Sequence, residues 1–586
     1  MGLPVPAASD RRVWDDVDEP TIRGLLARGE ATLGEPWPLP LASGYARFHR
    51  DGDRDSYEQI LWARQERLTR AAVLAAATLD PRWIDEAADG VILLCEQSSW
   101  CWPAHDETFR RHGAVVPTVT DPWVDLGAGD VAALLAWTDH LLGDQFDERM
   151  PGVRARIRHE VQLRVLRPFQ QRRDWRWLGL DGPVGNWTAW IHGDILTAAL
   201  QLEPDPGLIG AAVAGLRRFA AGLPADGAID EGYHYWWFGA CRLLEALELI
   251  GEDPPPTETV AFPHRMQLGD PWHLNHADGP ARPLPDMPWA ALHRAARRAG
   301  DFEAQAYAAA HRRPQDGVAH ESDGVGRVIR ALTDPQWVAA RPGPAPLPRD
   351  VWLPSTQVRI ARPRAGSAAG LTLAIKGGHN DEHHNHNDVG SFVVALGGVP
   401  VVVDPGRPTY TAQTFGPDRY SIWTMRSGWH NVPTIGGAEQ EPGREFAARA
   451  VAAGDDGLLL DIAGAYPRTH VKSWVRDARL DRTAGRITLR DAWEITPAAG
   501  EAPTLIHLVL AGDVTAGPGR AEVIALDGAG VLMLTWEPAV PCRTVVRELD
   551  DPQLSGVWGE RLTRLDIDVT GLGTVGSLEL TCEERR

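Results

Sequence analysis

Three histidines and an aspartate lie within six residues of the chain, in the sequence His-His-Asn-His-Asn-Asp at 383–388, shortly before an apolar run that begins at Phe392. Alternate residues of an extended segment point to the same side, so we expect His384, His386 and Asp388 to share one face. Imidazole and carboxylate groups gathered in this way suit a metal ion or a proton-transfer site. A purely structural role would not need so many titratable groups.

Two later residues could complete a metal site. Asp404 follows the apolar run at 399–403, and His430 stands in the sequence Trp-His-Asn. Neighbouring strands of a β-sandwich could bring His386, Asp404 and His430 together as a nitrogen and oxygen set for zinc, with a fourth position open. The alternative is a hydrogen-bonded polar cluster without a metal ion.

Two segments of the first half carry further candidates. A helix beginning near Asn186 would place Asn186 and Trp190 one turn apart on one face, and an amide beside an indole suits a sugar site. The alternative is a helix cap and a core tryptophan. Residues 95–106 combine polar and aromatic groups in an expected loop, which could line a cleft or serve only in capping.

A tyrosine follows a glutamate by four residues in the sequence Glu-Gly-Tyr-His-Tyr at 231–235. A helix that starts around Asp230 would place Glu231 and Tyr235 on one face and Tyr233 roughly opposite. A phenol can donate a proton unaided, but it acts as a base only if its neighbours lower its pKa from about 10. A buried tyrosine with a satisfied hydroxyl is the alternative.

Composition excludes several classes of protein. The formal net charge of -20 argues against binding to nucleic acid or to an anionic membrane, and an acidic substrate would need a locally positive or hydrogen-bond-donating pocket. The five cysteines are odd in number and lack metal-type spacing, which predicts reduced thiols. No basic and apolar leader and no apolar run of about 18 residues is found, so we expect a cytoplasmic protein.

The spacing of apolar residues changes once along the chain. From about residue 56 to 310 it is helical, as in Leu68 and Ala72 or in Val131 and Leu134. After the proline-rich stretch at 341–348 it turns to short β-type runs, at 370–375, 392–396, 399–403, 487–489, 504–510 and 575–581. This order predicts a multidomain chain with a helical domain at 1–340 and an antiparallel β-sandwich at 341–586. Successive helical pairs could close into a toroid.

Taken together, these motifs resemble those of the heparinase II/III-like polysaccharide lyases. In the second half the resemblance rests on residues 384–392, on Asp-Pro-Gly at 404–406 and on Trp-His-Asn at 429–431. In the first half it rests on Asn-Trp at 186–187 and on Glu-Gly-x-x-Tyr at 231–235. The likeness covers most of residues 90 to 440. It implies an incomplete α/α toroid followed by an antiparallel β-sandwich, with the substrate cleft between them.

The resemblance also implies a reaction and its residues. The reaction is β-elimination at a uronic acid, which breaks the C4–O4 bond, leaves an unsaturated sugar and consumes no water. Asn186 would offset the charge of the uronate, Tyr235 would be the general acid and a candidate base, and His384 would be the partner base or a charge stabiliser. Glu231 would orient Tyr235. In the same likeness His386, Asp404 and His430 would hold a structural zinc ion. Arg419 and Arg426 lie near His430 in the sequence and are candidate contacts for the acidic sugar, with ordinary surface arginines as the alternative.

Alternatives from other classes remain open at this point. A metal-containing glycoside hydrolase should show two carboxylates across its cleft, and a catalytically silent glycan-binding protein would make no product. A cytoplasmic lyase would meet imported oligosaccharides, which favours exo action. The sequence does not fix the uronic acid, the linkage, the sulfation, endo or exo action, which of Tyr235 and His384 is the base, or the oligomeric state, for which a dimer is one option.

Overall fold

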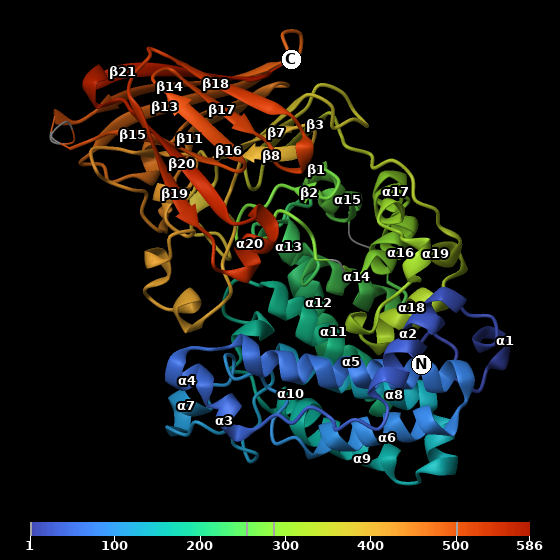
Figure 1. Cartoon of the computed structure of the whole chain (residues 1–586). Helices are drawn as coiled ribbons and strands as arrows, with labels where there is room; N and C mark the ends of the chain where they lie inside the picture. The colour runs from blue at the N-terminus through green and yellow to red at the C-terminus, as the bar shows by residue number, and fades with distance from the viewer. Residues whose placement is uncertain (1–2, 253–255, 285–286, 498, 500–501, 586) are drawn as a thin grey trace.

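Helices fill the first part of the chain and strands the second in the computed structural model, which describes residues 3–252, 256–284, 287–497, 499 and 502–585 (Figure 1). The helices of the first part are α1 (Arg11–Trp14), α2 (Glu19–Thr32), α3 (Ala42–Tyr45), α4 (Arg47–Asp51), α5 (Asp55–Thr78), α6 (Pro81–Glu96), α7 (Thr108–His112), α8 (Leu126–Arg149), α9 (Val153–Val161), α10 (Arg167–Gln171), α11 (Asn186–Leu202), α12 (Pro206–Gly222), α13 (Gly232–Trp236), α14 (Ala240–Leu249), α15 (Thr257–Arg265), α16 (Trp289–Ala299), α17 (Phe302–Ala310), α18 (Val325–Leu332) and α19 (Pro335–Ala339). They pack on one another as an incomplete α/α toroid.

Aspartate-proline pairs start several of these helices. Asp80 and Asp205 each precede a proline, and each side chain accepts a hydrogen bond from a backbone N–H of the first turn, in α6 and α12 respectively. Proline suits the first helical position because the N–H that it lacks would have no partner there. The aspartate side chain accepts a hydrogen bond from another N–H of the first turn, which would otherwise have no partner. Pro206 therefore occupies the first position of α12.

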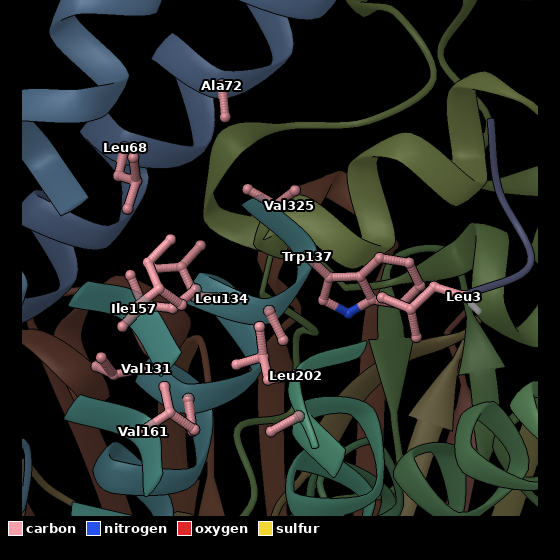
Figure 2. Close-up of a cluster of buried hydrophobic side chains, with 14 of the residues drawn as sticks. Leu3, Leu68, Ala72, Val131, Leu134, Trp137, Ile157, Val161, Leu202 and Val325 are labelled. Atoms are coloured by element: carbon pink, nitrogen blue, oxygen red, sulfur yellow. The ribbon is translucent and has the colours of Figure 1, made fainter. Parts of the chain in front are cut away.

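The interior of the toroid is built from the apolar stripes that the sequence predicts. Leu68 and Ala72 of α5 and Val131 and Leu134 of α8 are buried in one hydrophobic cluster (Figure 2). Helices also occur outside the predicted range of 56 to 310, such as α2, α18 and α19. Most of those are too short, or carry too few apolar residues, to show helical periodicity clearly.

Two antiparallel sheets stack to form the second part (Figure 1). Among the described residues one sheet has nine strands: β3 (Asp350–Leu353), β4 (Val358–Ala361), β5 (Leu371–Lys376), β7 (Phe392–Leu396), β8 (Val399–Val402), β9 (Pro433–Thr434), β15 (Leu505–Leu510), β19 (Cys542–Glu548) and β20 (Arg561–Asp568). The other has eight: β11 (Arg449–Ala453), β12 (Gly457–Asp461), β13 (Val471–Asp481), β14 (Arg486–Ile495), β16 (Asp513–Gly517), β17 (Arg520–Ile524), β18 (Val531–Glu537) and β21 (Val575–Glu584). Each strand pairing within both sheets is antiparallel.

Short elements complete the fold. Two-stranded ribbons join β1 (Gln267–Gly269) with β2 (Trp272–His273) and β6 (His379–Asn380) with β10 (Gly443–Ala447), and helix α20 (Pro552–Trp558) precedes β20. None of the described helices is both long enough and apolar enough to cross a membrane. All five cysteines are free thiols.

The nine-stranded sheet is covered on both faces. Phe392 and Val394 of β7 pack toward the second sheet, whereas Val393 and Ala395 pack in a cluster with helical residues such as Trp236. Burial on both faces explains why β7 is a continuous apolar run, while β14, which has one face in solvent, alternates buried and more exposed residues. The helix-then-sandwich prediction is confirmed, and the exact domain division at residue 340 stays a prediction.

Candidate active site

A cavity of about 1250 Å³ is lined by residues of both halves of the chain. Asn186, Glu231 and Tyr235 reach it from the helical half, and His384 reaches it from a loop of the sheet half. Trp102 and His105, in the loop that follows α6, also line it, so of the two alternatives for this segment the structure favours the cleft. The four residues that the sequence singled out for proton transfer and charge stabilisation thus share one space.

Tyr235 and His384 are in direct contact across the two halves. Their rings stack with centroids 3.9 Å apart and planes 19° from parallel. The Tyr235 hydroxyl lies 2.5 Å from the hydroxyl of Tyr410, which follows β8 in the sheet half. Burial raises the pKa of the Tyr235 phenol above its ordinary value, so the hydroxyl keeps its proton at neutral pH.

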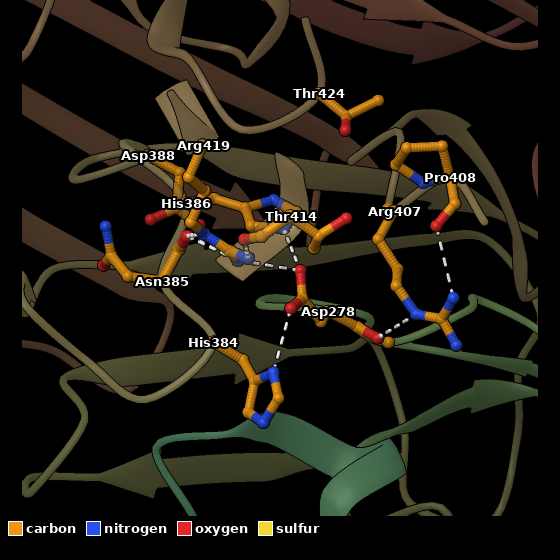
Figure 3. Close-up of polar contacts among 12 residues, drawn as sticks. Asp278, His384, Asn385, His386, Asp388, Arg407, Pro408, Thr414, Arg419 and Thr424 are labelled. Atoms are coloured by element: carbon orange, nitrogen blue, oxygen red, sulfur yellow. Dashed lines mark hydrogen bonds and ion pairs between the residues drawn. The ribbon is translucent and has the colours of Figure 1, made fainter. Parts of the chain in front are cut away.

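The carboxylate of Asp278 joins the histidines to one another (Figure 3). Oδ2 accepts hydrogen bonds from His384 Nδ1 at 2.9 Å and from the Tyr410 hydroxyl at 3.0 Å. Oδ1 accepts from His386 Nε2 and from Arg419 Nη2, both at 2.9 Å. Burial alone would raise the pKa of Asp278, but the histidine donors and Arg419 hold it well below its usual range. Asp278 is therefore an ionised, fully buried acceptor.

The bond to Asp278 sets the tautomer of His384. If Nδ1 carries the proton that Asp278 accepts, Nε2 of the neutral ring keeps its lone pair. Nε2 lies 3.7 Å from Oε1 of Glu231, whose pKa burial raises to about 7. Glu231 thus faces His384, and the hydroxyl of Tyr235 has Tyr410 as its partner in place of Glu231.

Asn186 is the first residue of α11, and Gly185 occupies the capping position before it. The Asn186 side chain caps nothing, so the helix-cap part of that alternative is wrong, whereas Trp190 is buried in the hydrophobic cluster of the helical half, as its second part expected. Its amide is largely buried at the edge of the cavity and has no hydrogen-bond partner in the part of the chain that the structure describes. Trp190, one turn later, also lines the cavity, and its Nε1 donates to Asp130 at 2.8 Å.

The predicted metal ligands meet behind the cavity. One ligand atom each of His386, Asp404 and His430 lies within 4.8 Å of the others, and all three residues are buried. His386 gives its Nε2–H to Asp278, and His430 gives its Nε2–H to the backbone oxygen of Thr424 at 2.9 Å. Each ring therefore directs its Nδ1 toward the space between the three side chains. The buried Nδ1 of His386 has no hydrogen-bond partner among the described residues. Two such nitrogens and a carboxylate suit zinc.

The loop at 383–388 differs from its predicted conformation. It is a series of turns, and His384 has a positive φ of 56°, which interrupts the alternation expected of an extended segment. His384 therefore opens to the cavity, His386 lies with Asp404 and His430, and Asp388 forms an ion pair with Lys376 at 2.7 Å. The expectation that all three share a face is wrong.

The two candidate arginines have other contacts. Arg419 is held by Asp278 and by the backbone oxygens of Asn385 and Thr414, and Arg426 pairs with Glu439 at the surface. Neither is among the residues that line the cavity. Sequence reasoning missed Asp278 and Tyr410 because each lies in an irregular segment without periodicity; the Asp-Pro-Gly motif just before Tyr410 was the nearest available signal.

Comparison with known proteins agrees with this picture. Residues 347–533 match the family model described as "Heparinase II/III-like, C-terminal", which confirms the predicted resemblance for that segment. No curated protein matches the chain.

Solved structures extend the likeness to the whole fold. A heparinase III is similar with a TM-score of 0.62 at 12% identity, over 100% of this chain and 86% of that one. Heparan sulfate lyase HepC from Pedobacter heparinus has a TM-score of 0.58 at 13% identity, over 96% and 87%. Chondroitin AC lyase of Streptomyces coelicolor A3, in complex with chondroitin sulphate, has a TM-score of 0.55 at 15% identity, over 98% and 82%. The TM-scores establish a shared fold, and at such low identities they establish the fold alone.

Replacing Asp278 with Asn should destabilise the protein strongly. An amide cannot balance the buried charge of Arg419 or accept equally from both histidines, and breaking a buried ion pair typically costs about 3–5 kcal/mol. Denaturant unfolding followed by circular dichroism measures the change. Asp527→Asn is the matched control, because Asp527 also pairs with an arginine, Arg282, but at the surface, where the expected cost is about 1 kcal/mol or less. Equal effects of the two substitutions would contradict the central role of Asp278.

Glu231→Gln should change the pH dependence of stability. Because the pKa of Glu231 is raised from 4.5 to about 7 in the folded chain, its ionisation destabilises the fold increasingly as pH rises through this range. The variant should therefore have a higher melting temperature than the wild type at about pH 8, and the difference should shrink toward about pH 5. Glu19→Gln, at an exposed position, should show no such trend. A pH-independent difference for Glu231→Gln would count against the raised pKa.

Proposed function

We propose that the chain is a polysaccharide lyase, a carbon–oxygen lyase that cleaves acidic, uronate-containing glycans by β-elimination. The observation that carries this proposal is the stacking of Tyr235 on His384 in one cavity, with the unpartnered amide of Asn186 on the same lining. The matching family model and the lyase structures with the same fold support it.

The reaction explains why these groups are needed. The C5 proton of a uronate is only weakly acidic, because a carboxylate next to it resists further negative charge. An enzyme must offset that charge and stabilise the enolate-like species that forms when the proton leaves. The C5–H electron pair then forms the C4–C5 double bond, the C4–O4 bond breaks, and O4 takes up a proton. Asn186 is placed to donate hydrogen bonds to the uronate carboxylate.

We assign proton removal to His384 and proton donation to Tyr235. Nε2 of His384 keeps a lone pair because Nδ1–H is committed to Asp278. Burial raises the pKa of Tyr235, which makes its phenol a poor base but keeps the proton available for O4. Tyr410 links the Tyr235 hydroxyl to Asp278 and thereby orients it. Glu231 faces Nε2 of His384 and acts as a positioning residue.

We further propose that His386, Asp404 and His430 hold a structural zinc ion. The proposal is supported by the two inward Nδ1 atoms and by Asp278, which accepts from the other nitrogen of His386. Zinc bound there would fix the geometry of the loop that carries His384 and would not activate water. The zinc ligands and the candidate base would then share Asp278 as a common support.

Tyr235→Phe should abolish most of the activity while leaving the fold intact. Loss of a general acid typically lowers kcat by about 10²- to 10⁴-fold. The assay is the ultraviolet absorbance of the unsaturated product from a panel of heparan-type, chondroitin-type and alginate-type oligosaccharides. Mass analysis should show fragments lighter by one water than those of hydrolysis.

The matched control is Tyr233→Phe, because the Tyr233 hydroxyl bonds to Tyr307 and does not line the cavity. This variant should keep its kcat. Products with the mass of hydrolysis would support the glycoside hydrolase instead, and wild-type protein that binds glycans without any product would support the silent glycan-binding protein.

Purified protein should contain about one zinc ion per chain by elemental mass spectrometry. His430→Ala and Asp404→Asn should lose the metal, because three protein ligands are the minimum for a stable site. His383→Ala, which removes a histidine that pairs with Asp230 outside the triad, should retain it. A chelator should lower the melting temperature of the wild type and of His383→Ala, but not of the two variants that lack the metal. Wild-type protein that takes up no metal when zinc is supplied would refute the proposal.

A further inference from the structure

Two segments that are far apart in the sequence meet at the lining of the cavity. The backbone of Asp53 forms a β-bridge with Thr411, and the N–H of Ala412 donates to the backbone oxygen of Gly52 at 3.3 Å. This contact between residues 52–54 and 410–412 places Arg54, from the helical half, beside Tyr410, whose hydroxyl contacts Tyr235.

The guanidinium of Arg54 is held in a fixed orientation. Its Nε donates to Oε1 of Glu58 at 2.7 Å, and its Nη2 lies 3.1 Å from Nε2 of His105. The side chain is only 12% exposed, so its position is set by packing as well as by hydrogen bonds. A planar guanidinium with two of its three nitrogens committed presents the third in a defined direction.

The tautomer of His105 is fixed in turn by a buried carboxylate. Nδ1 of His105 lies 2.8 Å from Oδ2 of Asp125, while Oδ1 of Asp125 caps helix α8 through the N–H of Ala128. Burial lowers the pKa of His105, which favours the neutral ring. With the Nδ1 proton given to Asp125, Nε2 accepts from Arg54. The contacts from Asp125 through His105 therefore orient Arg54, and because His105 is neutral, Glu58 is the carboxylate that pairs with Arg54 directly.

The remaining nitrogen of Arg54, Nη1, has no hydrogen-bond partner in the described part of the chain, and Arg54 lines the cavity. The centre of its guanidinium lies 5.8 Å from the ring centroid of Trp102 and 5.9 Å from that of Tyr410. His105 also packs against Trp102 and Trp187, at 5.2 and 4.4 Å between ring centroids. A directed cation beside aromatic surfaces is suited to an acidic sugar.

We propose that Arg54 is an anion-binding residue of this cavity and that, together with Asn186 or at a neighbouring group, it binds a carboxylate or sulfate of the substrate next to Tyr235. The inference rests on the proposed function, because it takes the substrate to be an acidic oligosaccharide. His105 is a positioning residue that acts through Arg54. Arg54 thereby helps to determine which acidic glycans the cavity accepts.

Kinetics of Arg54→Gln and Arg54→Lys test the proposal. Loss of a hydrogen bond between charged groups should raise KM by about 10- to 100-fold for the glutamine variant, with a smaller change in kcat. Lysine keeps the charge but not the planar fork, so its effect should be intermediate. Circular dichroism checks the fold of each variant, and Arg54→Lys keeps the test decisive if Arg54→Gln does not fold. Arg23→Gln, at an exposed position of α2, removes the same charge and should leave KM unchanged.

The substrates distinguish the two anionic groups. Tetrasaccharides of unsulfated chondroitin, chondroitin sulfate and alginate are compared. A raised KM on all of them assigns Arg54 to the uronate carboxylate, and a raised KM on the sulfated substrate alone assigns it to a sulfate. An unchanged KM for folded Arg54 variants on every substrate that the wild type cleaves would overturn the proposal.

A double-mutant cycle tests the role of His105. His105→Ala should raise KM in the wild-type background but have little further effect in Arg54→Gln, because the two residues act through one contact. Additive effects would show that His105 does not act through Arg54.

Binding separates this proposal from the proposed function. If the wild type forms no unsaturated product from any glycan, the lyase assignment fails. Arg54 is then judged from titration of the same tetrasaccharides, followed by the fluorescence of tryptophans such as Trp102. Weaker binding by Arg54→Gln than by the wild type would still support Arg54 as an anion-binding residue, and equal or absent binding would refute it.

Discussion

The Asp278 carboxylate is completely removed from solvent, and a charge in that position is stable only when donors surround it. Those donors come from the residues on which the candidate site depends. His384 and Tyr410 face the cavity, His386 lies with Asp404 and His430 behind it, and Arg419 supports the loop that carries both histidines. The need to compensate one buried charge therefore fixes the tautomers of two histidines and the position of one tyrosine hydroxyl.

The arrangement requires the two halves of the chain to be packed firmly together. The nine-stranded sheet supplies one face to the second sheet and the other to helical residues such as Trp236 and Trp237. Hydrophobic burial on this second face holds the helical half against the sheet half. Tyr235 and His384 can stack across the junction because the junction belongs to the core.

The sequence predicts those parts of the structure that local patterns of residues encode. The run that forms β7 and the stripes of α5 and α8 were predictable, because burial and periodicity leave a direct trace in the order of residues. Family motifs pointed to Asn186, Glu231, Tyr235 and His384, which do share the cavity. The contact between Asp278 and His384 spans 106 positions of the sequence and leaves no local pattern. The left-handed backbone of His384 made the prediction of an extended segment wrong. Long-range contacts and single strained residues of this kind need the folded structure.

The stacking of Tyr235 on His384 has a consequence for how the chain can move and evolve. In the proposed mechanism the groups assigned to proton donation and proton removal lie on opposite sides of the junction, so an opening of the junction would separate them. Neither half contains a complete set of reacting groups. Recombination that exchanged one half for that of a distant relative would need to preserve the docking geometry to within the thickness of an aromatic ring.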